Sequence, residues 1–168
     1  MPTPILTTER LTLRPITLFD AADIHASLNH PDVPGWLTNV PYPYTLADAE
    51  DFIRNTAQSP EGHHWAIDAG TGLIGIISVA SELGYWLNAD HHSKGYMSEA
   101  ARAVVAWHFA HTESDLISGY HVANRPSANV LTKLGFENTH QEDQIKVATG
   151  KPVKTQRMVL TKDRWRCT

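Results

Sequence analysis

The chain has 168 residues, 42% hydrophobic and 19% charged, enough for one domain with a core and too few for two comfortable ones. Its formal net charge is −4, and its basic residues form no patch longer than the scattered group at 151–157, so we expect no nucleic-acid partner. No apolar run reaches the roughly 20 residues of a membrane helix and no secretory signal is visible, so we expect a cytoplasmic protein with no membrane contact.

The first elements are expected from periodicity and capping signals. Residues 11–15 alternate with period two and predict a strand. Thr17 and Asp20 have the spacing of a helix start, which predicts a helix to about Leu28. Residues 31–43 contain four prolines and are expected to form a loop. A second cap at 45–48 predicts a helix that stops before residue 59.

The middle of the chain predicts strands around one long helix. Residues 64–69 and 73–80, separated by a glycine-rich turn, are typical of a hairpin, and 83–87 predict the next strand. After a turn that contains Gly95, apolar residues spread over a wide face predict a buried helix that ends near His111.

The last third predicts a strand at 116–122, a short helix at 127–134 stopped by Gly135, and two strands around 137–147 and 153–160. The predicted order is β-α-α-β-β-β-α-β-α-β-β. This order indicates a single α/β domain over residues 1–168 with a mixed sheet.

Metal binding is not expected. The single cysteine, Cys167, lies beside the C-terminus and has no intrachain partner. Ten histidines include adjacent pairs at 63–64 and 91–92, and neighbouring strand residues point to opposite faces. No cysteine or suitably spaced carboxylate completes a ligand set, so we expect packed or solvated histidines.

The turn between Leu87 and the long helix has the chemistry of an anion site. A strand, a short glycine-containing turn and a helix leave several free backbone N–H groups at the positive end of a helix dipole. Such an arrangement binds phosphate or pyrophosphate. Taken alone, one glycine in this position also fits an ordinary loop.

Further motifs follow one another in order along nearly the whole chain. They are Thr8-Glu9-Arg10-Leu11-x-Leu13-Arg14, Pro43-Tyr44-Thr45-x-x-Asp48-Ala49-x-x-Phe52-Ile53, Gly84-Tyr85-Trp86-Leu87, Lys94-Gly95-Tyr96-x-Ser98-Glu99-Ala100 and Asn124-x-x-Ser127-x-x-Val130-Leu131-x-Lys133-Leu134-Gly135-Phe136. Their combination resembles the GNAT N-acetyltransferases. Within that family it is most similar to the branch named after ribosomal-protein-alanine acetyltransferases.

The resemblance implies a fold and a reaction. The GNAT fold has a central, mostly antiparallel sheet that splays between its fourth and fifth strands, here 83–87 and 116–122, with helices on its faces. The family transfers an acetyl group from acetyl-CoA, used as a co-substrate without a metal, to an amine. The pyrophosphate would bind backbone N–H groups from His92 to Met97, the pantetheine arm would lie beside residues 84–87, and the N–H of Leu87 or Asn88 would polarise the thioester carbonyl.

The resemblance also implies a set of site residues. The cofactor contacts it predicts are Trp86, Leu87, Asn88, His92, Ser93, Lys94, Gly95, Tyr96, Met97, Asn124 and Ser127. The chain departs from the family pattern at two of them. Ser93 stands where glycine is common, and Met97, where alanine or glycine is common, is large enough to crowd the phosphates.

The two proton transfers require an acid and a base. For the acid that protonates the leaving thiolate, the resemblance indicates Ser127, which as a residue also suits the N-cap of the helix that follows. For the base we expect Glu82 first, followed by His64 and Glu142; each also suits a solvated surface group. An α-amine, with a pKa near 7.7–8.0, needs less help from a base than a lysine amine near 10.4.

The acceptor is left open by the sequence. Trp36, Tyr42 and Tyr44 lie in the loop that borders the acceptor site in this family, so Trp36 and Tyr44 are expected to contact the substrate or simply to pack. The acceptor is a protein N-terminus, or a small amine such as a polyamine, amino acid or aminoglycoside. Asp48, Glu50 and Asp51 would suit a cationic acceptor and equally suit a first helical turn. A non-catalytic acetyl-CoA-binding module, an unrelated nucleotide-binding domain, and a monomer or homodimer also stay open.

Overall fold

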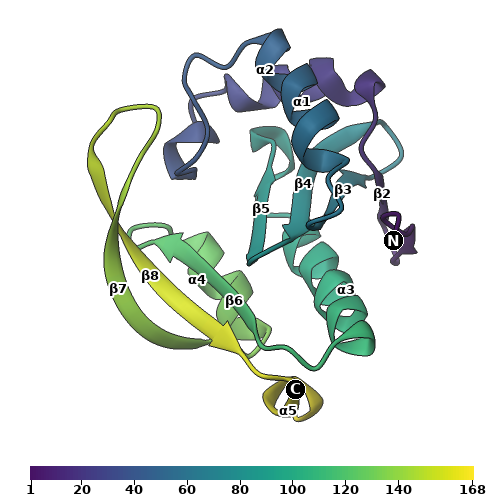
Figure 1. The fold of residues 1–168 in the computed structure, drawn as a ribbon, viewed down its shortest axis with the longest axis vertical. Coiled ribbons are helices and arrows are strands. Elements are labelled where there is room, and N and C mark those ends of the chain that lie inside the picture. The colour runs from purple at the N-terminus through teal and green to yellow at the C-terminus, as the bar shows by residue number, and fades with distance from the viewer.

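The computed structural model describes residues 1–168 (Figure 1). Its helices are α1 (Ala21–Leu28), α2 (Leu46–Asp51) with a π-helical continuation η3 (Phe52–Ala57), α3 (Tyr96–His111), α4 (Arg125–Lys133) and α5 (Lys162–Arg166), and its 3-10 turns are η1 (Leu18–Asp20), η2 (Pro34–Trp36) and η4 (Ala89–His91). Its strands are β1 (Leu6–Thr7), β2 (Thr12–Pro15), β3 (His63–Asp68), β4 (Leu73–Val79), β5 (Leu83–Leu87), β6 (Leu116–His121), β7 (Glu137–Ile145) and β8 (Pro152–Leu160). None of the helices is both long and apolar enough to cross a membrane.

The strands form two antiparallel sheets. The first has the order β1-β2-β3-β4-β5 and the second the order β6-β8-β7. The α/β fold expected from the sequence is confirmed, and every predicted helix and strand is present. The mixed sheet expected from the order of elements is not found: all paired strands are antiparallel, in agreement with the mostly antiparallel sheet that the family resemblance implied. β1 and α5 were not expected, because both are too short to show a period.

Helices cover both faces of the first sheet because its side chains alternate. Trp65 and Ile67 on β3 belong to the core beneath α3 and α4, whereas Ala66 between them belongs to the core beneath α1 and α2. Trp65 is fully buried, and its Nε1 donates to the carbonyl oxygen of Pro4 (2.7 Å). This bond holds the N-terminal segment against the sheet.

The two sheets separate at β5 and β6 (Figure 1). Ser118 Oγ on β6 donates to Leu83 O on β5 (2.8 Å), and no backbone ladder joins the two strands. A cleft of about 1420 Å³ opens beside this contact, lined by β5 from Leu83 to Leu87 and by β6 from Gly119 to His121. The splayed sheet predicted from the family resemblance is therefore confirmed.

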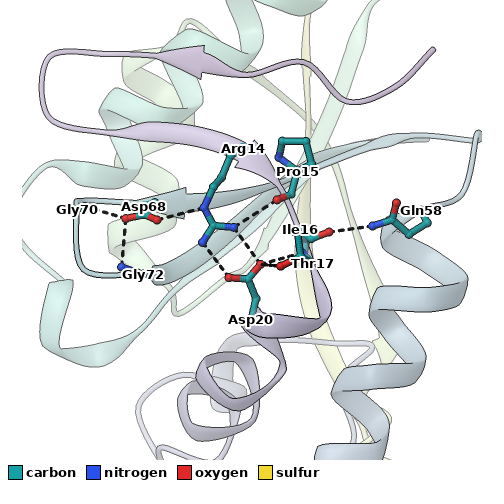
Figure 2. Close-up of polar contacts among 9 residues, drawn as sticks. All are labelled: Arg14, Pro15, Ile16, Thr17, Asp20, Gln58, Asp68, Gly70 and Gly72. Carbon is teal, nitrogen blue, oxygen red and sulfur yellow. Dashed lines mark hydrogen bonds and ion pairs between the residues drawn. The ribbon is translucent and has the colours of Figure 1, made fainter.

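A buried ion pair fixes the start of α1 against the sheet (Figure 2). Arg14 on β2 donates through Nη2 and Nη1 to the two carboxylate oxygens of Asp20 (2.8 and 3.0 Å) and through Nε to Asp68 (3.1 Å). Asp20 is only 4% exposed and also accepts from the Thr17 N–H (2.8 Å). Burial raises the pKa of Asp20, but these hydrogen bonds outweigh it, so the pKa lies below its ordinary value.

Candidate active site

One edge of β5 faces the cleft with its backbone. Asn88 N–H donates to Ile74 O (2.8 Å) and Ala80 N–H to Glu82 O (3.3 Å), which sets the alternation of hydrogen-bonded pairs between β4 and β5. By that alternation the N–H and C=O groups of Leu83, Tyr85 and Leu87 point away from β4, toward the cleft. The ladder to β4 leaves the Leu87 N–H available and occupies that of Asn88.

The turn after β5 presents a row of unpaired donors. The backbone N–H groups from Ser93 to Ser98 have no acceptor within the protein, and no side chain caps the N-terminus of α3. We refer to residues 93–98 as the phosphate loop. Its shape requires left-handed backbone at Gly95 (φ +77°) and at Ser93 (φ +62°). That conformation favours glycine, which accounts for the glycine common in the family where Ser93 stands.

His92 lies at the edge of this loop, and its backbone N–H is not free to bind a ligand as expected. Its N–H donates to Ala89 O (3.3 Å), and its Nε2 bonds to Leu87 O (2.8 Å). His91 Nδ1 bonds to Asn88 Oδ1 (2.6 Å). Both imidazoles therefore hold the turn in place, and the row of free donors begins at Ser93 rather than at His92.

The remaining side chains of the loop differ in their surroundings. Met97 is 9% exposed and belongs to the main core, so the crowding expected from its size is relieved by burial. Tyr96 lies beneath the guanidinium of Arg10, 4.6 Å from ring centre to Cζ. Lys94 is exposed and lies outside the wall of the cleft.

Ser127 lies at the start of α4 on the cleft wall. Asn124, not Ser127, is the N-cap of that helix: its Oδ1 accepts from the Ser127 N–H (3.3 Å), and α4 begins two residues earlier than expected. Pro126 in the first turn suits this earlier start. The Ser127 hydroxyl is thus free of the capping role.

Tyr85 is the partner of that hydroxyl. Its OH lies 2.8 Å from Ser127 Oγ. Burial raises the pKa of Tyr85 to about 12, although the bond to Ser127 acts in the opposite direction. This contact was not expected from the sequence, because nothing local to residue 85 indicates a partner 42 residues further along the chain.

Two of the predicted bases are ion-paired. Arg157 on β8, only 12% exposed in its side chain, forms a salt bridge with Glu82 and approaches Glu142 (Nε–Oε1 3.6 Å). Glu142 also accepts from Gln144 (3.1 Å). Both carboxylates are therefore engaged by donors within the protein. Arg157 was not foreseen, because its partners lie in the turn between β4 and β5 and on β7.

His64, the third predicted base, is on the cleft wall in an apolar setting. It is 9% exposed, its Nδ1 is buried without a hydrogen-bond partner, and its ring meets Phe52 edge-on at 5.8 Å between centroids. Burial, with a smaller effect of His63, lowers the pKa of His64. The imidazole is therefore neutral at pH 7.

Residues of the proline-rich loop and α2 form the other end of the cleft. Trp36 and Tyr44 both line it; Trp36 is 44% exposed, and Tyr44 is buried in the core beneath α1 and α2. Asp48 accepts from the Thr45 N–H (2.8 Å) and Asp51 from Asn55 Nδ2 (2.7 Å), so both carboxylates serve α2. Trp86 and Asn124 also line the cleft.

Comparisons with known proteins agree on one family. Residues 10–137 match the family model described as an acetyltransferase (GNAT) domain. The chain is 28% identical over 177 residues to an uncharacterized N-acetyltransferase, YoaA, of Bacillus subtilis strain 168, covering 96% of this chain and 98% of that protein.

Two solved structures share the fold at low identity. The ribosomal-protein-S5-alanine acetyltransferase of Vibrio fischeri has a TM-score of 0.75 and 18% identity, covering 96% of this chain and 98% of that one. The microcin C7 self-immunity acetyltransferase MccE, in complex with acetyl-CoA and AMP, has a TM-score of 0.81 and 17% identity, covering 96% and 97%. With the family model spanning most of the chain and the splayed sheet beside an uncapped helix start, the protein belongs to the GNAT family of N-acetyltransferases, as its motifs predicted.

Proposed function

We propose that this enzyme transfers the acetyl group of acetyl-CoA to the α-amine at the N-terminus of a protein or peptide. The observation that carries the cofactor assignment is the row of unpaired N–H groups from Ser93 to Ser98 at the start of α3, next to the free edge of β5. A helix N-terminus of this kind suits a pyrophosphate, and a free strand edge suits an extended amide chain.

The residues of the cleft then have distinct roles. Acetyl-CoA supplies the acetyl group as a thioester. The Leu87 N–H donates to the thioester carbonyl oxygen, since the Asn88 N–H is occupied by Ile74 O. The attacking amine gives up one proton to the base or to water. Ser127 Oγ, oriented by Tyr85, donates a proton to the departing thiolate, and the serine regains a proton from water, which balances the proton lost by the amine.

The weakness of the available bases supports an α-amine as acceptor. Glu82 and Glu142 are engaged by Arg157, and the pKa of His64 is lowered. Roughly a tenth of an α-amine with a pKa of 7.7–8.0 is already neutral at pH 7, against about one in a few thousand lysine amines. Of the three bases expected from the sequence, His64 is the one with a buried atom that lacks a hydrogen-bond partner, its Nδ1.

A cationic small molecule has less support. The acids that would recognise it at the cleft end, Asp48 and Asp51, each accept a hydrogen bond from a residue beside α2, the Thr45 N–H and the Asn55 side-chain amide. A cationic acceptor would have to share these carboxylates with those donors.

A thiol-release assay tests the proposal. Purified protein is incubated with acetyl-CoA and a matched panel: a peptide with a free N-terminus, the same peptide with an acetylated N-terminus and a free lysine, spermidine, and a free amino acid. We expect turnover that is highest with the free N-terminal peptide. Preference for the lysine peptide or spermidine would contradict the α-amine assignment, and CoA binding without turnover of any acceptor would contradict catalysis.

A further inference from the structure

Glu99 is the centre of a group of contacts behind the phosphate loop. Its Oε1 accepts from Thr8 Oγ1 (2.6 Å) and from the Arg10 backbone N–H (2.8 Å), and its Oε2 accepts from Arg10 Nε (2.7 Å). The Glu99 side chain is 17% exposed. Burial raises the pKa of Glu99, but the hydrogen bonds from Thr8 and Arg10 outweigh it and leave the pKa below its ordinary value. Glu99 therefore stays a carboxylate at neutral pH.

Arg10 carries these contacts forward to the loop itself. Its Nη1 donates to Lys94 O (2.9 Å), and its guanidinium lies over the Tyr96 ring. Gly95 lies between these two contacts, and a Cβ on it would stand 3.4 Å from Arg10 Nη2. Arg10 thus contacts the residues on both sides of Gly95.

Arg10 is outside the wall of the cleft, whereas Gly95, Tyr96, Met97 and Ser98 form part of that wall. The guanidinium therefore supports the loop from behind. A direct phosphate ligand would instead line the cleft together with the N–H groups.

We propose that Arg10 and Glu99 are positioning residues for acetyl-CoA: Glu99 orients the Arg10 guanidinium, and Arg10 holds the phosphate loop in its binding conformation. This inference rests on the proposed use of the loop for the cofactor. The physical reason is conformational. The loop includes left-handed backbone at Ser93 and Gly95, and a free loop would populate other conformations that do not align its N–H groups. Because Arg10 already holds the loop before the ligand binds, less conformational entropy is lost on binding.

The substitution Glu99→Gln gives a test in which two explanations predict opposite changes in CoA affinity. Coulomb's law alone predicts tighter CoA binding, since an acid is removed from the neighbourhood of an anion site. The proposed positioning of Arg10 by Glu99 predicts weaker CoA binding. In the variant, a neutral amide replaces the carboxylate that accepts from Arg10 Nε, so this hydrogen bond is weakened or lost. We expect the Kd for CoA, measured by calorimetry at low temperature, to rise about tenfold.

A second variant separates geometry from charge. Arg10→Lys keeps the positive charge but cannot bond both Glu99 and Lys94 O with a rigid fork, so we expect a similar rise in the Kd for CoA. The matched control is Arg102→Lys, since Arg102 lies on α3, as Glu99 does, and its guanidinium is over the Trp165 ring (5.7 Å). We expect the control to bind CoA as the wild type does.

Kinetics distinguish positioning from a general loss of stability. At saturating acetyl-CoA, Glu99→Gln should keep its kcat while the KM for acetyl-CoA rises with the Kd. If the wild type binds CoA and Glu99→Gln binds it equally or more tightly, the proposed function stands and the positioning role of Arg10 and Glu99 is overturned. A lowered Tm with unchanged CoA affinity would also overturn it. Wild-type protein that fails to bind CoA would instead overturn the proposed function.

Discussion

Tyr85→Phe removes one hydroxyl from the active site and leaves the ring in place. In the wild type that hydroxyl lies 2.8 Å from Ser127 Oγ and 3.4 Å from the backbone oxygen of the same residue. The substitution leaves Ser127 Oγ without this bond. Because the aromatic ring still fills its site between β5 and the helices, we expect the fold to be kept.

The size of the effect follows from the role of the lost bond. A hydrogen bond between neutral groups contributes about 0.5–1.5 kcal/mol net. A hydroxyl that is free to occupy three staggered rotamers has its population in the productive rotamer lowered by up to about threefold. Together these predict a kcat about 2–40-fold below wild type. Ser127→Ala, which removes the proton donor itself, should lose more, about 10²–10⁴-fold.

The assay compares kcat from thiol release with the Kd for CoA from calorimetry in the two variants. Neither variant should change the Kd by more than about twofold if the hydroxyls act on the departing thiolate. Since the pKa of Tyr85 is about 12, its ionisation plays no part between pH 6 and 9, and Tyr85→Phe should lower kcat equally over that range. A kcat equal to wild type, or a parallel loss of CoA affinity, would refute this reasoning.

Three further predictions concern stability and the loop. Asp20→Asn should lower the free energy of unfolding in urea by about 2–3 kcal/mol, because it breaks a buried charge-assisted pair with Arg14; a loss below about 0.5 kcal/mol would contradict the assigned role. Since the pKa of His64 is lowered by folding, the unfolded chain takes up its proton first below about pH 6.5, and stability should fall as the pH decreases, by up to about 1.4 kcal/mol per pH unit. His64→Phe should remove part of that fall between pH 7.5 and 5.5, and an identical slope in the variant would show that other groups cause it. Gly95→Ala should lower stability by about 1–2 kcal/mol, because φ is +77° and the added Cβ approaches Arg10, and should weaken CoA binding; unchanged affinity would mean that the loop tolerates another backbone conformation.

Local signals account for the parts of the site that the sequence predicted. The helix starts at Thr17 and Thr45 and the β5–α3 turn depend on residues within a few positions of one another, so spacing alone indicates them. The family motifs added the splayed sheet and the cofactor. Ser127 was expected to serve both as helix cap and as acid, and the cap proved to be Asn124.

The order of the elements, the buried faces and the family were thus determined by the sequence, because period, capping and motif spacing are properties of neighbouring residues. Only the tertiary structure decided which side chains are free for chemistry. Arg157 engages Glu82 from 75 residues away, Arg10 meets Glu99 across 89, and β4 occupies the Asn88 N–H while leaving that of Leu87. Such pairings depend on strand register and on how sheets and helices pack, and neither can be read from adjacent residues.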